Sequence, residues 1–296
     1  MQITAAMVKE LRERTGSGMM ECKKALTEAN GDIDAAVEAM RKAGLAKADK
    51  RAGRVAAEGR VIIKVDAGGR RAVMVEVNCE TDFVARGDDF QGFVEAVANK
   101  ILEIAPANLE ALSNLSLGSD GSSVEQVRQA LVAKIGENMA VRRFTVLDSD
   151  AGRFATYLHG TRIGVVVEMT GGSVELGKDI AMHVAASRPV CVSPDLVPAE
   201  LVAKEREIFT AMSVESGKGK SPAIIEKMVE GRVRKFLDEV ALTGQPFVKD
   251  LNMTVGKLLA THKAAITRFV RYEVGEGIEK KSVDFAAEVM AQVQGG

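Results

Sequence analysis

The side chains with the clearest chemical potential lie together in one segment, Glu80-Thr81-Asp82-Phe83-Val84. The segment follows an apolar, β-branched stretch, so we expect it to leave the end of a strand as a loop that leads into a helix near residues 90–97. A carboxylate beside an aromatic ring on such a loop is suited to contact with a partner. An aromatic residue after a strand is more often a core residue, however, and the segment alone does not decide between the two interpretations.

The rest of the chain shows no motif typical of an enzyme. Gly219-Lys220-Ser221 is similar to the end of a phosphate-binding loop, but Val214 stands where that pattern needs a glycine, and no strand is expected before it. The histidines, His159, His183 and His262, are far apart, and none has the partner four residues away that a helical metal site would need. We expect His183 to be packed or to cap a helix, and His159 to lie exposed at a hairpin tip. We therefore predict no catalytic residue, no metal site and no cofactor.

Composition and charge are those of a soluble globular protein of about two domains, with 296 residues, of which 46% are hydrophobic and 27% are charged. The formal net charge of −1 gives no general attraction to nucleic acid. The cysteines, Cys22, Cys79 and Cys191, are odd in number and form no C-x-x-C pair, so neither a disulfide framework nor a zinc site is expected. We found no targeting segment and no stretch near the roughly 20 apolar residues of a membrane span, and we expect a cytoplasmic location.

The elements that must position the segment form a repeating pattern in an α+β fold. Residues 61–65 and 72–77 predict a β-hairpin around a Gly-rich turn, followed by the acidic segment and a helix. Residues 156–159 and 163–169 predict a second hairpin, followed by a helix through residues 180–185. Each small antiparallel sheet needs a helix on one face to bury its apolar side. We therefore predict two repeated half-domains, at residues 53–145 and 146–275.

Residues 4–43 have helical periodicity in three short segments that we expect to end near Gly16, Gly31 and Gly44. Together with the basic stretch that follows, they form the predicted domain 1–52. Met19 and Met20 begin the second helix as neighbours and cannot both point inward, so at least one is expected on the surface, where methionine suits an adaptable contact. The alternative is that both fill gaps between helices.

Residues 41–54 contain six basic side chains and one acidic side chain. This composition is typical of a solvated linker, and it is also the best candidate in the chain for contact with RNA. No aromatic residue in the stretch could stack on a base, which favours the linker.

Two long, charged helical patterns interrupt the second half-domain at residues 198–215 and 222–242. A Gly- and Lys-rich turn joins them, so we predict an antiparallel helical hairpin at about 198–242. Between the half-domains, residues 106–123 predict a loop or weak helix and residues 124–136 a clearer helix. Residues 269–274 alternate like a returning strand, and residues 284–293 predict a last short helix.

Several of these segments, in the same order, resemble the translation elongation factor Ts family. The resemblance covers essentially the whole chain and is clearest in the following residues: Val8-Lys9-Glu10-Leu11-Arg12-Glu13-Arg14-Thr15-Gly16, Met19-Met20-Glu21-Cys22-Lys23-Lys24, Thr81-Asp82-Phe83-Val84, His159-Gly160-Thr161-Arg162, Ala181-Met182-His183-Val184 and Leu242-Thr243-Gly244-Gln245-Pro246-Phe247-Val248. It implies that the N-terminal helices form a ubiquitin-associated-like module. It also implies that the helix at 284–293 belongs to a C-terminal helical module, at 276–296, that packs on the partner protein. It also implies guanine-nucleotide exchange on elongation factor Tu, without chemistry of the chain's own.

The resemblance also implies which residues contact elongation factor Tu, in its GDP-bound and nucleotide-free states. Thr81, Asp82, Phe83 and Val84 would act near the partner's Mg²⁺ ion and dislocate it. Further contacts are implied for Lys23, Ile135, Gly136, His159 and Val248, to which the exposed Met19 or Met20 is added on chemical grounds. The family often has an apolar residue after that valine, and Lys249 departs from this pattern.

A different class of function stays open as an alternative, namely an RNA- or ribosome-binding accessory protein that uses the basic stretch and the helical hairpin. Phosphate contacts weaken steeply with salt, whereas an apolar contact loses little, so salt dependence distinguishes the two. Nucleic acid is not expected as the main partner. The sequence leaves open whether the chain forms an oligomer.

Overall fold

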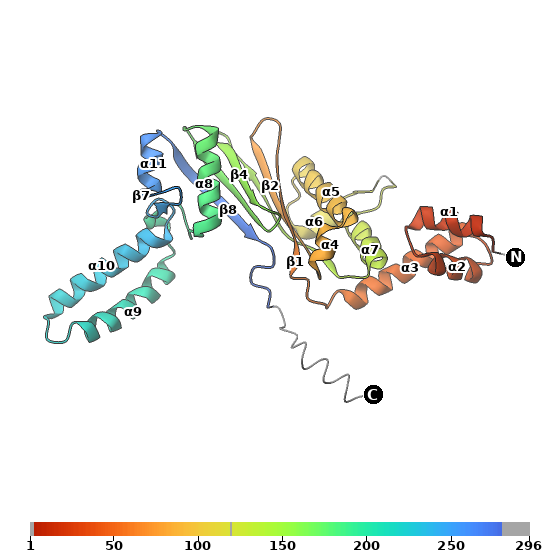
Figure 1. Cartoon of the computed structure of the whole chain (residues 1–296), viewed down its shortest axis with the longest axis horizontal. Helices are drawn as coiled ribbons and strands as arrows, with labels where there is room; N and C mark the ends of the chain where they lie inside the picture. The colour runs from red at the N-terminus through yellow and green to blue at the C-terminus, as the bar shows by residue number, and fades with distance from the viewer. Residues whose placement is uncertain (1–2, 119, 280–296) are drawn as a thin grey trace, which may run out of the picture.

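A helical module, two small sheets covered by helices and a projecting helical hairpin follow one another along the molecule (Figure 1). The computed structural model describes residues 3–118 and 120–279. The predicted helix at 284–293, and most of the C-terminal module, lie outside these residues. The fold is α+β with antiparallel sheets, as the sequence predicts.

The N-terminal helices are α1 (Ala5–Thr15), α2 (Met19–Glu28) and α3 (Ile33–Arg51). They share a small core that includes Leu11, Cys22 and Leu26. The predicted stop at Gly44 is wrong, because α3 continues to Arg51. A Cβ atom at Gly44 would lie 3.2 Å from Cβ of Ala133, so this glycine allows a close helix contact and does not end the helix. Most of the predicted linker is therefore ordered helix.

The first sheet contains β1 (Glu58–Val65), β2 (Arg71–Cys79) and β3 (Met139–Asp148), all antiparallel, with β2 in the centre. The chain between β2 and β3 forms α4 (Asp82–Arg86), α5 (Asp88–Ile104), α6 (Leu109–Ser113) and α7 (Val124–Ile135). Apolar side chains of α5 and α7, such as Phe90, Val97 and Val132, pack with Val75 and Val77 in the largest core. The hairpin and the two main helices were predicted, whereas β3 was missed.

The second sheet contains β4 (Arg153–His159), β5 (Ile163–Thr170) and β8 (Ala265–Glu273), again antiparallel and with the middle strand second in sequence. Helices α8 (Val174–Ser187) and α11 (Val255–Thr261) cover its outer face through Ile180, Val184 and Leu259. The hairpin, α8 and the returning strand agree with the prediction.

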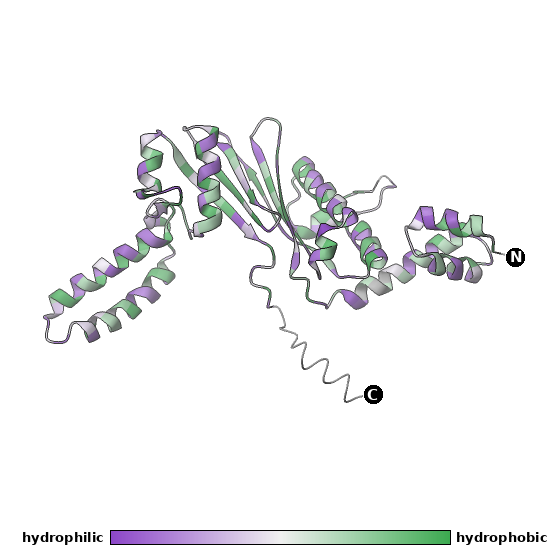
Figure 2. Cartoon of the chain, in the orientation of Figure 1, coloured by the Kyte–Doolittle hydropathy of each residue, from purple (hydrophilic) through white to green (hydrophobic). Residues whose placement is uncertain are grey.

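The two sheets pack against each other between the two helical layers. Val61, Met74, Val166 and Tyr272 belong to the cluster that they share, and Figure 2 shows hydrophobic residues running along these strands. A Cβ atom at Gly164 would lie only 2.5 Å from Val61 Cγ1, so the absence of a side chain at Gly164 allows the two sheets to approach closely there.

The inserted hairpin consists of α9 (Ala199–Ser216) and α10 (Pro222–Val240), which lie side by side and project from the second sheet (Figure 1). A short 3₁₀ helix, η1 (Pro194–Leu196), precedes it. After it, β6 (Pro246–Phe247) and β7 (Asp250–Thr254) form a tight two-stranded turn that the sequence did not reveal.

Candidate partner-binding site

Thr81 to Val84 form the start of a short helix and not the predicted loop. Thr81 is extended and caps α4, because its Oγ1 accepts a hydrogen bond from Val84 N at 3.3 Å. Asp82 follows in the first turn, where a carboxylate is favoured by the helix dipole. Gly87 then separates α4 from α5. The segment is therefore part of the regular structure that begins directly beyond β2.

Phe83 points away from the core, with 82% of its surface exposed. Ala85, by contrast, is buried and Val84 packs on the main core, so α4 has an inner face and an outer face. The interpretation of Phe83 as a core residue is wrong. Asp82 is half-exposed and forms an ion pair with Arg86 one turn later, at 2.7 Å. A large apolar ring and a carboxylate are thus presented together at the surface.

Hydrogen bonds to the start of β3 hold the base of α4. Thr81 N and Thr81 Oγ1 donate to Glu137 Oε2 and Oε1, at 3.0 and 2.7 Å. Asn138 N donates in the opposite direction to Glu80 Oε1 at 2.6 Å. The Cys79 thiol donates to Thr81 O, and burial, followed by the charge of Glu137, raises the pKa of this thiol to about 12. The thiol therefore stays protonated as a donor near neutral pH.

Ile135 and Gly136 end α7 beside this network. Gly136 caps α7 in the left-handed region at φ +94°, which turns the chain toward Glu137. Ile135 packs partly against the main core. The structure thus brings Ile135 and Gly136, distant in sequence, to the base of α4, where Glu137 contacts Thr81.

Met19 and Met20 are both exposed, at 61% and 77%, on the first turn of α2. The sequence required at least one exposed methionine, and the reading in which both fill gaps is wrong. Lys23 is exposed on the same helix. This surface belongs to the N-terminal module.

His159 and Val248 belong to the second half of the chain. His159 is exposed at the end of β4, and its Nδ1 lies 3.1 Å from Tyr157 Oη. Val248 is partly buried at the turn between β6 and β7, and Lys249 next to it forms an ion pair with Asp179 at 2.6 Å. Lys249 is thus engaged within the chain, where the family pattern would place an apolar side chain.

Leu251 was not singled out from the sequence, yet 74% of its surface is exposed on β7. Its signal was weak, because Asp250-Leu251-Asn252 gives no apolar period and β7 was not predicted. A large apolar side chain at the edge of this turn, close in sequence to Val248, extends the candidate contact surface.

His183 fixes the turn that carries Val248, in line with the expectation of a packed side chain. It is fully buried on α8, and its Nδ1 accepts a hydrogen bond from Val248 N at 3.3 Å. Since Nδ1 accepts, Nε2 carries the proton and donates to Gln245 Oε1 at 2.9 Å. Burial lowers the pKa of His183, although the hydrogen bond to Gln245 acts in the other direction. The imidazole is therefore neutral.

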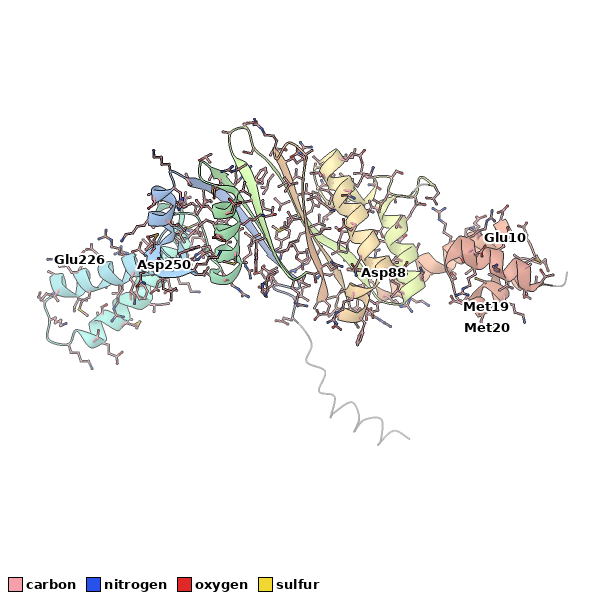
Figure 3. All side chains as sticks on the ribbon, turned by 45° about the horizontal axis from the view of Figure 1, so that its top comes forward. Glu10, Met19, Met20, Asp88, Glu226 and Asp250 are labelled. Carbon is pink, nitrogen blue, oxygen red and sulfur yellow. The ribbon has the colours of Figure 1, made fainter. Side chains whose placement is uncertain are left out.

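The candidate residues fall into three surfaces along one molecule. Figure 3 shows Asp88, just after α4, between the module that carries Met19 and Met20 and the turn that carries Asp250. Within residues 3–118 and 120–279, no group of three or more acidic, histidine or cysteine side chains could hold a metal ion. In that same part of the chain, no helix has both the length and the apolar character needed to cross a membrane.

Three of the six basic side chains in the stretch at 41–54 contact other groups of the chain. Lys42 pairs with Glu38 at 2.7 Å, and Arg54 approaches Glu80 at 3.6 Å. Arg51 Nη1 donates to Val132 O at 3.5 Å. These contacts link α3 and the residues that follow it to α7 and to the segment beyond β2.

Comparison with known proteins agrees across the whole chain. Residues 80–276 match the family model described as "Elongation factor TS". The protein named elongation factor Ts from Methylococcus capsulatus is 62% identical over 295 residues, which cover 99% of each chain. The proteins of the same name from Thioalkalivibrio sulfidiphilus and Legionella pneumophila are 61% and 59% identical, covering 100% of both chains and 99% of both chains respectively.

Proposed function

Because the chain belongs to the elongation factor Ts family, we propose that it promotes exchange of guanine nucleotide on elongation factor Tu. The observation that carries the proposal is the exposed Phe83 on α4, beside the carboxylate of Asp82. The chain would act as a cytoplasmic translation factor, through binding and without covalent chemistry of its own.

Exchange by binding follows from linkage between two ligands of one protein. If the chain binds nucleotide-free elongation factor Tu more tightly than the GDP-bound form, GDP must bind the complex more weakly by the same factor. Each tenfold change corresponds to about 1.4 kcal/mol of differential contact. The contacts that matter are therefore those that only the nucleotide-free partner can make.

Asp82 and Phe83 are suited to make such contacts near the Mg²⁺ ion that accompanies the nucleotide on the partner. Mg²⁺ demands a nearly ideal octahedron of oxygen ligands, so a small displacement of the groups around it costs much of its binding. Phe83 would supply the displacing volume, and Asp82 would compete for the groups that order the ion. Thr81 and Val84 would hold this pair in place.

The remaining surfaces would supply binding that does not depend on the nucleotide. We assign to them Met19, Met20 and Lys23 on the module, Ile135 and Gly136 at the base of α4, and His159, Val248 and Leu251 on the second half. The exposed Met19 and Met20 support this assignment, because Met side chains are enriched at interface cores.

We also interpret residues 4–43 as a ubiquitin-associated-like module and the two sheets as repeated half-domains. Support for the repeat comes from strand order, since each sheet has a hairpin followed by a helix and a third strand that pairs with the second. The two halves would then place separate contact surfaces on one partner.

Release of labelled GDP from elongation factor Tu tests the proposal. The chain should accelerate release, and Phe83→Ala should slow it by at least about tenfold, equal to about 1.4 kcal/mol of lost differential contact. Because Phe83 is exposed, the variant should melt like the parent. Leu196→Ala serves as the control, since Leu196 is also an exposed apolar residue but lies on η1. Equal rates for the parent and Phe83→Ala would reject the displacing role of Phe83.

A further inference from the structure

We propose that Glu137 is a positioning residue for α4, the helix that carries Phe83. Its carboxylate fixes where α4 begins and therefore where Phe83 points. The inference rests on the proposed function only in assigning exchange to α4. The contacts that support it belong to Thr81, Glu137 and their neighbours in sequence, at the end of β2 and the start of β3.

Glu137 determines how the hydroxyl group of Thr81 is oriented. A hydroxyl group has one proton to donate, and Thr81 Oγ1 donates it to Glu137 Oε1 at 2.7 Å. The lone pairs of the same oxygen are then free to accept Val84 N, which is the bond that caps α4. The second carboxylate oxygen accepts Thr81 N at 3.0 Å, so the cap residue is held at both its backbone and its side chain.

The contact is reciprocal between two pairs of adjacent residues. Glu137 accepts from Thr81, and Glu80 accepts from the backbone of Asn138 at 2.6 Å. The last paired residues of β2 and β3 are Cys79 and Met139. Two carboxylates thus replace carbonyl oxygens directly beyond the end of the ladder. They end the sheet and begin the helix at a defined residue.

Helix α4 depends on this support because it is only five residues long. A helix of that length is not stable on its own in water. Val84 and Ala85 anchor its inner face, but Phe83 on the outer face is 82% exposed and is placed by the backbone alone. Loss of the Glu137 contacts should therefore disorder the start of α4 and leave the core intact.

A fluorescent reporter at residue 83 can measure this order directly. The chain contains no Trp, so Phe83→Trp introduces a single one at the position of interest. We would compare its fluorescence anisotropy in the Phe83→Trp chain and after adding Glu137→Gln or Glu137→Ala. Gln keeps one acceptor oxygen and Ala keeps none, so the anisotropy should fall slightly with Gln and further with Ala. Glu103→Gln is the matched control, since Glu103 pairs with Lys100 within α5, at 2.9 Å.

Exchange kinetics, measured with Phe83 unchanged, should show whether Glu137 positions α4 or contributes to binding of the partner. Loss of hydrogen bonds to a charged group predicts that Glu137→Ala lowers the maximal rate of GDP release by about tenfold, with Glu137→Gln in between. The concentration for half-maximal release should change by less than about twofold, because the other surfaces still bind. Circular dichroism should show the parent's helix content and a cooperative melt.

Three results would overturn the inference. Unchanged anisotropy in Glu137→Ala would show that Glu137 does not order α4. A higher half-maximal concentration with an unchanged maximal rate would make Glu137 a docking residue. Lower anisotropy with no change in either kinetic value would remove α4 from exchange. In that last case Phe83→Ala would also release GDP at the parent's rate, which identifies the proposed function as the part that failed.

Discussion

Glu76 of β2 lies opposite Arg143 of β3, and Arg143 Nε donates to the Glu76 carboxylate at 2.6 Å. The same relationship occurs in the second sheet, where Glu168 of β5 lies opposite Arg268 of β8, also at 2.6 Å. In both sheets the register shifts directly after the glutamate. Each central strand therefore has its charge pair and its irregularity at corresponding places.

The Glu76 pair should matter more for stability than the Glu168 pair. Glu76 is fully buried and also accepts from Arg142 and from Gly275 N, so its loss removes the acceptor of several partly buried donors. Glu76→Gln should lower the free energy of unfolding by about 3 kcal/mol, and Glu168→Gln, whose partner Arg268 is more exposed, by about 1 kcal/mol. Urea unfolding of both variants measures the difference. Equal losses would contradict this ranking.

The contribution of Glu76 to stability should also be visible at acid pH. Burial raises the pKa of the Glu76 carboxyl, but hydrogen bonds from Gly275, Arg143 and Arg142 lower it more in sum, so it lies below its ordinary value. A lowered pKa means that Glu76 contributes stability above its unfolded pKa and loses it as the pH falls through the folded value. The parent should therefore lose more stability than Glu76→Gln between pH 5 and acid unfolding.

Asp82→Ala should weaken exchange in a way that depends on Mg²⁺. We expect about a tenfold slower release of GDP when the partner's Mg²⁺ is saturated, and less than about a twofold change when a chelator has removed the ion. The chelator would already have removed the Mg²⁺ ion that the Asp82 carboxylate helps to dislocate. Arg86→Ala is the control, because it breaks the ion pair but keeps the carboxylate. Equal loss at every Mg²⁺ concentration would assign Asp82 to docking.

Truncations on either side of Gly44 should behave differently. Deleting residues 1–43 removes the module core, including Leu11 and Leu26, and should weaken binding to elongation factor Tu but leave the remaining fold stable. Deleting residues 1–54 also removes Ala48 from the main core and the Ala52 and Arg54 carbonyls that Asn138 Nδ2 contacts. That deletion should cost about 2–3 kcal/mol more.

Thermal melts and titration calorimetry of the two truncated chains would measure both effects. Full affinity after either deletion would exclude docking by the module. Identical melting of the two chains would show that the end of α3 adds nothing to the core.

His183 should make the second half sensitive to mild acid. Because its folded pKa lies below that of the unfolded chain, its contribution to stability is complete above the ordinary histidine value of about 6.5 and is lost as the pH falls below it. One extra proton on the unfolded chain gives a slope of at most about 1.4 kcal/mol per pH unit. Melts between pH 7.5 and 5 should show this slope in the parent and in His262→Gln, but not in His183→Gln. A persistent slope in His183→Gln would point to another group.

The apolar pattern of the sequence predicted the elements in which it is uninterrupted. It failed where charged side chains stand within a strand. The strand at 61–65 was recognisable as a short apolar run, and the helices at 124–136 and 222–242 were recognisable from their helical patterns. β3 was missed because Arg142 and Arg143 interrupt its alternation. Both arginines are there to pair with Glu76, which lies on another strand and cannot be linked to them from sequence.

The individual candidate residues were predictable from the sequence. The contacts that hold them in place were not. Thr81 to Val84 stood out as a motif, yet a helix as short as α4 leaves no period to detect. Glu137 gave no signal at all, because its importance arises from a contact 56 positions away in sequence. Gly44 looked like a helix end because glycine usually acts there through backbone freedom, whereas here it acts through its small size.

Because α3 is long, a small tilt at one of its ends moves the other end a long way. Its 19 residues span about 28 Å at about 1.5 Å per residue, with the last turns fixed on α7 and the first turns bearing the module. A tilt of about 10° at the fixed end would carry the other end by about 5 Å over that length. Directly after α3, Asn138 contacts the carbonyls of Ala52 and Arg54. Asn138 is next in sequence to Glu137, whose contacts hold α4. A change in the tilt of α3 would therefore act on the same few residues that set the direction of Phe83.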